Sequence, residues 1–360
     1  MNRLENMSKP LVWSTALLLT AIVAGCGGST GAAGTPGAQG NPGIPGIPGV
    51  SGVPGTPAPS TAPGAVNLLS AASYALTTSA GLTASIGTAS GVANSATFGG
   101  NVAMDAPTSA CTSTPAVSAV GEDSCGLNTA TADTINPAVN TAGGLAITGT
   151  TIRYNPGVNN TTGFNASVRA VKADVNTAWN DAFNRTGGAL ITGPGILDGR
   201  VLPPGVYASA STMTLGSGQT LTLDAGGNAN AVWIFQVGSS LTITGSTVAC
   251  TGTAPVVCTP TQIVLANGAL AKNVFWQVGT PGAAGAGNVS FPAATGPVEN
   301  NTLFNGTILA GGSVTFGGGT AMVGRVLAGA DLLGTPNTQT GGAVSATGGS
   351  TGAVTVTLPL

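Results

Sequence analysis

The side chains that usually carry catalysis are scarce in this chain of 360 residues. It contains no His, and Asp and Glu together number only 11. Without His, nucleophilic sites of the Ser-His-Asp and Cys-His types are excluded. Glu122 and Asp123 form an adjacent acidic pair, which a solvated turn explains better than a catalytic or calcium site. Paired carboxylates of the glycosidase type stay open as a minor alternative. We therefore expect a protein that is not an enzyme and needs no cofactor.

The cysteines indicate an oxidising location. Five are present, and Cys26 is set apart by its position near the N-terminus. The simplest of the three pairings of the others gives two local disulfides, Cys111–Cys125 and Cys250–Cys258. Four free thiols are the alternative. Zinc binding is disfavoured, because the chain has no CxxC spacing and no His to complete a site.

Residues 1–25 have the features of a secretory signal peptide. Arg3 and Lys9 supply positive charge, and Leu11 to Ala24 is a mostly apolar run too short to span a bilayer comfortably. Val23 to Cys26 resembles the bacterial lipobox, which implies cleavage before Cys26 and acylation of that residue. Several acyl chains anchor a protein stably. Gly27 follows, without an Asp, and by resemblance this favours the outer membrane and the cell surface. An ordinary signal peptide with an incidental Cys is the alternative.

Residues 26–64 form a separate anchor and stalk region. Nine Gly residues recur at every third position from Gly31 to Gly55, and Pro fills most of the third places. This resembles a collagen-like Gly-X-Y tract, in which only Gly fits at the axis of a triple helix. A weak homotrimer is one consequence. The other is a semi-rigid polyproline-II spacer of about 80 Å, at about 3.1 Å per residue.

The composition of the remaining body, residues 65–360, is unusual for a soluble domain. Charged residues make up 6% of the chain, aromatic residues 4%, and the net charge is −2. No basic patch is present, so we expect no nucleic-acid partner. After residue 25, no apolar run approaches the length of a membrane span. The surface must therefore consist mainly of Thr, Ser, Asn, Gly and Ala.

Short strands dominate the second half of this body. Polar and apolar residues alternate in four segments, which predicts strands with one buried face: Thr220–Leu223, Leu241–Thr244, Ser313–Phe316 and Val354–Thr357. The fuller apolar run Ala231–Val237 predicts a strand covered on both sides.

Internal repeats define the architecture further. Gly306–Gly311 (GTILAG) returns as Gly324–Gly329 (GRVLAG), 18 residues later. Trp233–Val237 is echoed by Val274–Val278, which we place about two coils away with an insertion between them. Such periods with Gly turns predict a β-solenoid whose coils stack at about 4.8 Å.

One segment, about residues 165–185, has helical periodicity. Its apolar stripe comprises Val168, Val171, Val175, Ala178, Trp179, Ala182 and Phe183. Asp181 and Arg185 are four residues apart and can form a surface pair. We expect one long amphipathic helix that packs this stripe along the solenoid.

Several segments resemble the bacterial and microalgal ice-binding family of the DUF3494 type. They are Asp174–Gly187, Leu202–Tyr207, Leu221–Asp224, Ala231–Gly238, Ala271–Gly279, Phe304–Ala310 and Gly324–Ala328. The resemblance covers about residues 65–345 and implies a mainly β fold: a discontinuous right-handed β-solenoid of triangular section, flanked by one long helix. The stretch at about 105–160 departs from the pattern and indicates an insertion or cap.

The function implied by this resemblance is binding to the surface of ice crystals. A stack of coils presents a flat face on which outward Thr and Ser form a regular array. Many weak contacts made together by a rigid surface then provide the affinity. The period-two strands place the following residues outward as candidate ice contacts: Thr220, Thr222, Thr242, Thr244, Ser290, Ser313, Thr315 and Thr347.

The order of the segments suggests an adhesin. A lipid anchor, a spacer and a rigid head in series would hold a cell to ice. The alternative is a structural or adhesive module that keeps the solenoid but binds glycan or neighbouring cells.

Overall fold

The computed structural model describes residues 63–79, 82–86, 96–104, 134–135, 145–153, 164–191, 195–247, 259–283, 286–293, 302–330, 342–348 and 353–360. The chain divides into two compact units, Met1–Thr56 and Pro57–Leu360, and all described residues belong to the second unit. The signal peptide, Cys26, the Gly-X-Y tract and the four cysteines predicted to form disulfides lie outside the described residues.

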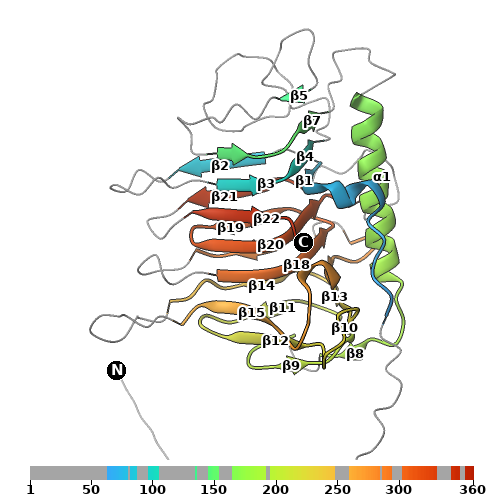
Figure 1. Ribbon diagram of the computed structural model, residues 1–360, viewed down its shortest axis with the longest axis vertical. Helices are drawn as coiled ribbons and strands as arrows, with labels where there is room; N and C mark the ends of the chain where they lie inside the picture. Colours follow the sequence, from blue (N-terminus) through green and yellow to red (C-terminus); the bar gives the residue numbers. More distant parts are fainter. Residues whose placement is uncertain are drawn as a thin grey trace, which may run out of the picture. The chain divides into compact units, whose positions relative to one another are not determined.

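The described strands form three stacks, which we call the helix face, the eight-strand face and the six-strand face (Figure 1). The helix face contains, in spatial order, β7 (Thr151–Arg153), β4 (Asn101–Met104), β1 (Tyr74–Thr78), β20 (Thr320–Ala328), β18 (Thr302–Ala310), β16 (Val274–Val278), β13 (Trp233–Val237), β10 (Gly205–Ser209) and β8 (Ala189–Leu190). The eight-strand face contains β6 (Leu145–Ile147), β3 (Ala96–Gly99), β22 (Val354–Thr357), the first halves of β20 and β18, β15 (Thr261–Ala266), β12 (Thr220–Asp224) and β9 (Val201–Leu202). The six-strand face contains β11 (Met213–Leu215), β14 (Leu241–Ile243), β17 (Val289–Phe291), β19 (Val314–Gly317), β21 (Val344–Gly348) and β2 (Leu82–Ile86).

Two long strands, β18 and β20, belong to two faces at once. Their first halves pair within the eight-strand face, and their second halves pair with β16 and β1 on the helix face. Gly306 lies at this corner with φ +118° and is in register with Gly324. A Cβ on Gly324 would lie 1.8 Å from the carbonyl oxygen of Gly306, so the corner tolerates only glycine there.

The order of coils in space differs from their order in sequence. Strand β1 pairs with β20, β2 with β21 and β3 with β22, so the N-terminal coil stacks on the C-terminal coil. The chain leaves β7 near one end of the stack and resumes in β8 at the other end. Helix α1 (Phe164–Phe183) makes this crossing, and its 20 residues span about 30 Å at 1.5 Å per residue. It runs beside the strands of the helix face (Figure 1).

The interior of the stack is apolar and includes a row of aromatic rings. Tyr207, Phe235 and Trp276 occupy successive strands in register, and the centroids of the Phe235 and Trp276 rings lie 3.9 Å apart. The Nε1 atom of Trp276 donates a hydrogen bond to the carbonyl of Asn305. Buried polar groups inside the row are thus paired with backbone carbonyls.

The sequence correctly predicted a mainly β fold of parallel strands with one long helix. The apolar stripe of α1 is buried except at Phe183, which is partly exposed. The 18-residue repeat corresponds to the direct register of β18 and β20. The predicted spacing of the other repeat was wrong, because Trp233–Val237 and Val274–Val278 form β13 and β16, which are adjacent. Long connections between the strands account for the larger sequence separation.

Strands β5 (Thr134–Ile135), β6 and β7 fall within the stretch expected as an insertion or cap. β6 pairs in parallel with β3, and β7 pairs in parallel with β4. β5 pairs with β7 and is antiparallel to it. Two short 3-10 helices complete the described elements, η1 (Leu69–Ser73) and η3 (Ala271–Asn273).

Candidate functional site

Helix α1 removes one of the three faces from contact with a partner. Val175 and Trp179 are buried in one cluster with Ile234 and Phe275 of the helix face. The Nε1 atom of Trp179 donates a hydrogen bond of 3.0 Å to the carbonyl oxygen of Val278. The helix face is therefore part of the core, and a surface for a flat partner must lie on another face.

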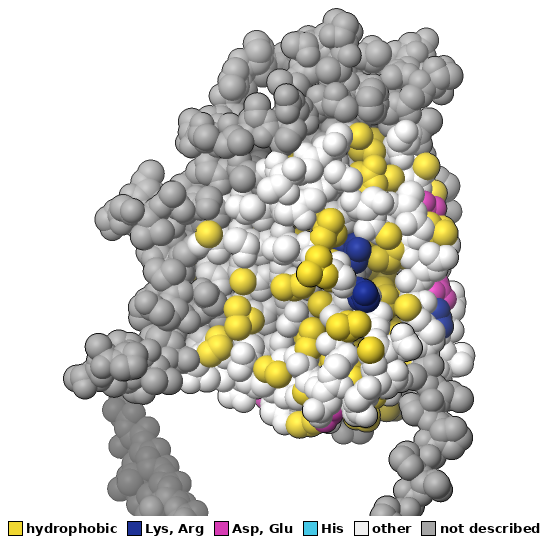
Figure 2. Space-filling view, viewed as in Figure 1, with side chains coloured by type: hydrophobic (Ala, Val, Ile, Leu, Met, Phe, Trp, Pro, Cys, Tyr) yellow, Lys and Arg dark blue, Asp and Glu magenta, His cyan; other side chains and the backbone are white. Residues whose placement is uncertain are grey.

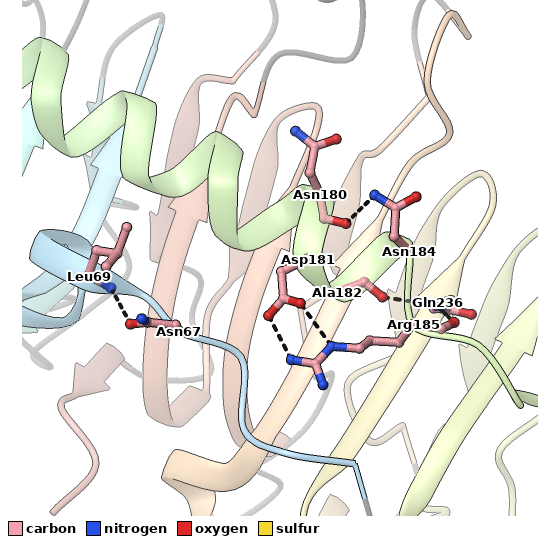
Figure 3. A network of polar contacts seen from close by, with 8 residues as sticks. All are labelled: Asn67, Leu69, Asn180, Asp181, Ala182, Asn184, Arg185 and Gln236. Atoms are coloured by element: carbon pink, nitrogen blue, oxygen red, sulfur yellow. Dashed lines mark hydrogen bonds and ion pairs between the residues drawn. The ribbon is translucent and has the colours of Figure 1, made fainter.

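A side chain of the sheet fixes the C-terminal end of α1. The Nε2 atom of Gln236 lies 2.8–2.9 Å from the carbonyl oxygens of Ala182, Phe183 and Arg185. Figure 3 shows Gln236 beside Ala182 and Arg185. These carbonyls have no partners within the helix, since the last turn lacks following N–H groups. The Arg185 guanidinium also pairs with Asp181 at 2.8 Å, as the spacing predicted. Gln236 and Trp179 together hold the helix against the sheet.

The six-strand face carries an unbroken column of hydroxyl-bearing residues. Register pairs join five of them directly, strand by strand: Thr214, Thr242, Ser290, Thr315 and Ser345. We call this set the hydroxyl column. The hydroxyl of Ser345 donates a hydrogen bond of 3.2 Å to Oγ1 of Thr315. Thr83 of β2 continues the same backbone register beyond Ser345.

The strand geometry fixes the spacing of the hydroxyl column. Neighbouring strands lie about 4.8 Å apart, and residues two apart on one strand lie about 6.7 Å apart. Both neighbours of each member along its strand are buried, as Val314 and Phe316 are beside Thr315. The outward direction of the column is therefore set by the core on the other side of each strand.

The side chains two residues before the hydroxyl column are polar on four of its five strands and form a second row: Thr212, Ser240, Asn288 and Ser313. Ser313 belongs to it, and its backbone N–H donates to Oδ1 of Asn288 at 2.9 Å. The Ser313 hydroxyl in turn accepts a hydrogen bond of 3.3 Å from the N–H of Gly342. Internal hydrogen bonds thus order the surface before any partner arrives.

The eight-strand face has a different composition. Thr220 pairs in register with Gln262, and Thr222 with Val264. Val323 on the same face is 42% exposed. This face mixes Thr with larger apolar and amide side chains, and its outward rows are less uniform than the hydroxyl column.

The predicted contact residues therefore divide between two faces. Three fall in the hydroxyl column: Thr242, Ser290 and Thr315. Three others lie on or beside the same face but outside the column: Thr244, Ser313 and Thr347. Thr220 and Thr222 lie on the eight-strand face, away from the rest.

Sequence reasoning missed Thr214 and Ser345, which complete the column. A recurring signal could have found them, because each column residue stands between two apolar residues in a triplet. The triplets are Met213-Thr214-Leu215, Leu241-Thr242-Ile243, Val289-Ser290-Phe291, Val314-Thr315-Phe316 and Val344-Ser345-Ala346.

Charge is absent from the six-strand face and sparse elsewhere. None of the six strands contains a charged residue. Figure 2 shows few charged side chains on the side of the molecule in view. Asp224, at the end of β12, accepts hydrogen bonds from the Gly226 N–H and the Asn267 side chain, and these lower the pKa of its carboxyl. Burial lowers the pKa of Arg325, whose Nε donates to the Ala72 carbonyl.

The described part of the chain lacks two features, a metal-binding cluster and a membrane-spanning helix. No cluster of three or more His, Cys, Asp or Glu side chains there could hold a metal ion. No helix in those same ranges is both long and apolar enough to cross a membrane.

Known proteins provide an independent comparison. Residues 47–339 match the model of a family described as ice-binding-like. An ice-binding protein of Flavobacterium frigoris (strain PS1) is 32% identical over 118 residues, which cover 32% of this chain and 36% of that protein. One from Nostoc sp. (strain HG1) is 33% identical over 178 residues, which cover 49% and 54% of the two chains. The matches thus span about half the length of these relatives or less.

Solved structures show the same fold at lower identity. An ice-binding protein from an Antarctic biological consortium matches with a TM-score of 0.52 and 22% identity, over 85% of this chain and 96% of that one. The ice-binding protein of an Arctic yeast matches with a TM-score of 0.52 and 22% identity, over 81% and 94% of the two chains. These similarities concern the arrangement of the strands and the helix.

Proposed function

Because the chain belongs to the ice-binding-like family, we propose that it adsorbs to ice crystals through its six-strand face. The hydroxyl column is the observation that carries this proposal. It repeats one chemical group at every strand from β11 to β21, in direct register and without a charged neighbour on those strands. A crystal surface is periodic, so a periodic row of hydroxyls can meet it many times at once.

The energetics require such repetition. A hydroxyl that exchanges bulk water for water in a crystal surface gains little by itself, since hydrogen bonds to water are replaced by similar ones. Contacts on one rigid body add up, because orientation is lost only once for the whole set. The parallel ladders and the bond between Ser345 and Thr315 fix the spacing beforehand.

The finer architecture belongs to the same proposal. Three stacks of parallel strands around one apolar interior support a discontinuous right-handed solenoid of triangular section. Helix α1 covers one side of it, which leaves two sides for partners. The described part of the 65–360 body is the head that carries the ice contact.

The proposed setting of this head is the cell surface. We propose that residues 1–25 are removed, that Cys26 carries lipid in the outer membrane, and that the Gly31–Pro57 tract acts as a spacer. The lipobox-like sequence and the unbroken Gly period support this arrangement. An anchored head would hold the cell to ice or modify ice near the envelope. Mass spectrometry of the wild-type chain and of Cys26→Ser would detect the acyl chains or their absence.

Assays of ice recrystallisation and crystal shaping test the central proposal. Residues 65–360 should inhibit recrystallisation and shape crystals at micromolar concentration. No effect on ice at that concentration would overturn the proposed function. A panel of carbohydrates is the accompanying test, and binding to glycan without any effect on ice would favour the adhesive alternative.

A second experiment tests the choice of face. Thr242→Tyr and Thr315→Tyr place a bulky ring in the middle of the hydroxyl column and should weaken ice activity. Thr222→Tyr makes the same change on the eight-strand face and should leave activity intact. Full activity in both column variants, with loss in Thr222→Tyr, would move the contact to the eight-strand face and leave ice binding itself standing.

The stalk requires its own measurement. Sedimentation of the chain with and without residues 28–57 would show whether the tract joins three copies. A trimer would multiply the ice contacts on one assembly, whereas a monomer would leave the tract as a spacer.

A further inference from the structure

The seam between the N-terminal and C-terminal coils, where β1 pairs with β20, contains three consecutive hydroxyl residues. Thr77 and Thr78 end β1, Ser79 follows them, and all three are more than nine-tenths buried. The Thr78 hydroxyl donates to the carbonyl oxygen of Gly342 at 2.6 Å, and the Ser79 hydroxyl donates to that of Gly329 at 3.1 Å. These bonds join the N-terminal coil to segments that lie some 250 residues later.

Thr77 differs from its two neighbours. Its Oγ1 is buried and has no hydrogen-bond partner among the described residues. A buried hydroxyl without a partner is costly, because it has given up its bonds to water and gained none. Native proteins seldom leave such a group unsatisfied, and an ordered water is a common remedy.

A cavity lies beside this hydroxyl, between the sheet and α1. The space open to the centre of a water-sized sphere is about 10 Å³. Its lining includes Thr77, Ala103 and Ala328 from the sheet and Val168, Val171 and Val175 from the helix. On this measure a single water needs roughly 10–15 Å³, so the cavity is at the lower limit for one molecule and too small for two.

We infer that one structural water molecule binds in this cavity and hydrogen-bonds to Oγ1 of Thr77. A buried water requires two to four polar partners. Ser79 also lines the cavity, and its hydroxyl keeps acceptor capacity after donating to Gly329. The water then links the hydroxyls of the seam beneath α1, where the N-terminal coil meets the C-terminal one. This site is independent of the hydroxyl column and of the proposed ice contact.

High-resolution diffraction from crystals of the full chain tests the inference directly. We expect a density peak within hydrogen-bonding distance of Thr77 Oγ1, and we expect it to vanish in Thr77→Val, which has nearly the same shape. Thr77→Ser, which keeps the hydroxyl, should retain the peak. An empty cavity in the wild-type chain would overturn the inference, and so would the Lys172 ammonium in place of water.

Thermal unfolding gives a second test, because Thr77→Val should shift Tm in opposite directions depending on whether the water is bound or the Thr77 hydroxyl is unsatisfied. If the water is bound, Thr77→Val loses a hydrogen bond, and Tm should fall by about 2–4 °C. If the hydroxyl is unsatisfied, its removal should raise Tm instead, which would contradict the inference. Should Thr77→Val fail to fold, the diffraction result for the wild-type chain and Thr77→Ser still decides.

Discussion

The hydroxyl of Ser345 donates a 3.2 Å hydrogen bond to Oγ1 of Thr315, across neighbouring strands of the six-strand face. The two residues are direct register partners in β21 and β19. Their bond restricts two side-chain rotors that would otherwise turn freely in water. This restriction favours binding to a crystal, because the entropy cost of ordering the side chains is met when the protein folds and not when it adsorbs.

Removing one hydroxyl of this pair should weaken ice adsorption. Thr315→Val keeps the shape and one methyl group but deletes the acceptor of the Ser345 bond. We expect the protein concentration needed to inhibit recrystallisation to rise about twofold, since one of several additive contacts is lost. Thr222→Val makes the same change on the eight-strand face and serves as the control. Equal losses in the two variants would show that the hydroxyl column has no special role.

Some elements were predictable because their signal is local. The stripe of α1 recurs at helical spacing, and Val168, Val175 and Trp179 are each 1% exposed. Gly306 and Gly324 begin segments that share four of six residues, and the structure places them in direct register. In both cases the information lies within a few turns or within one coil of the chain.

The division of outward residues between faces was not predictable in the same way. Alternation indicates that Thr222 and Thr242 both point away from the core, but the corner between their strands decides which face each one joins. Coils also differ in length, since Phe235 and Trp276 are register partners 41 residues apart. The pairing of β1 with β20 joins Leu76 to Val326, and no local pattern marks so distant a contact.

The cap of α1 should contribute measurably to stability. Gln236→Leu removes the amide that bonds the carbonyls of Ala182, Phe183 and Arg185. We expect a loss of about 1–3 kcal/mol in the free energy of unfolding, because partly buried acceptors lose their donor. Gln219→Leu changes an exposed Gln and should stay within about 0.5 kcal/mol of the wild type. Chemical denaturation measures both. Equal stability in the two variants would show that the carbonyls find other partners.

The corner at Gly324 should tolerate no side chain. A Cβ there would lie 1.8 Å from the carbonyl oxygen of Gly306. Gly306 belongs to β18, which pairs with β16 on one side and with β20 on the other. Gly324→Ala should lower the free energy of unfolding by about 3 kcal/mol or more, which is the upper end of the range for overpacked sites. The cost is high because the backbone cannot move away without breaking the hydrogen bonds between the strands. Gly199→Ala is the control, because Gly199 has φ +66° but open space around it. Its cost should be only the roughly 1–2 kcal/mol of left-handed backbone. A smaller loss for Gly324→Ala than for Gly199→Ala would contradict this account of the corner.

Tyr207 should respond to pH only in strong alkali. Burial raises the pKa of its phenol from 10.0 to about 12, and the hydroxyl donates to the carbonyl of Pro203 at 2.6 Å. In the unfolded chain the phenol ionises near its ordinary value. The stabilisation is therefore complete below about pH 10 and is lost as pH rises towards 12. Ultraviolet titration should show a late phenolate transition that is missing in Tyr207→Phe. A phenolate transition near pH 10 that is present in the folded wild type and missing in Tyr207→Phe would refute the shift.

The lower end of the hydroxyl column offers a gain-of-function test. Ile196 forms an isolated parallel bridge with Thr214, so it continues the column by one further position but without a hydroxyl. Its side chain is 41% exposed, and the position therefore accepts a shorter β-branched residue. Ile196→Thr should extend the periodic row and raise ice activity modestly, by less than about twofold, because one contact is added to several. Val201→Thr is the matched control, since Val201 is also exposed in the same terminal coil but belongs to the eight-strand face. Recrystallisation assays on the two variants should separate them. An increase in Val201→Thr alone would place the ice contact on the eight-strand face.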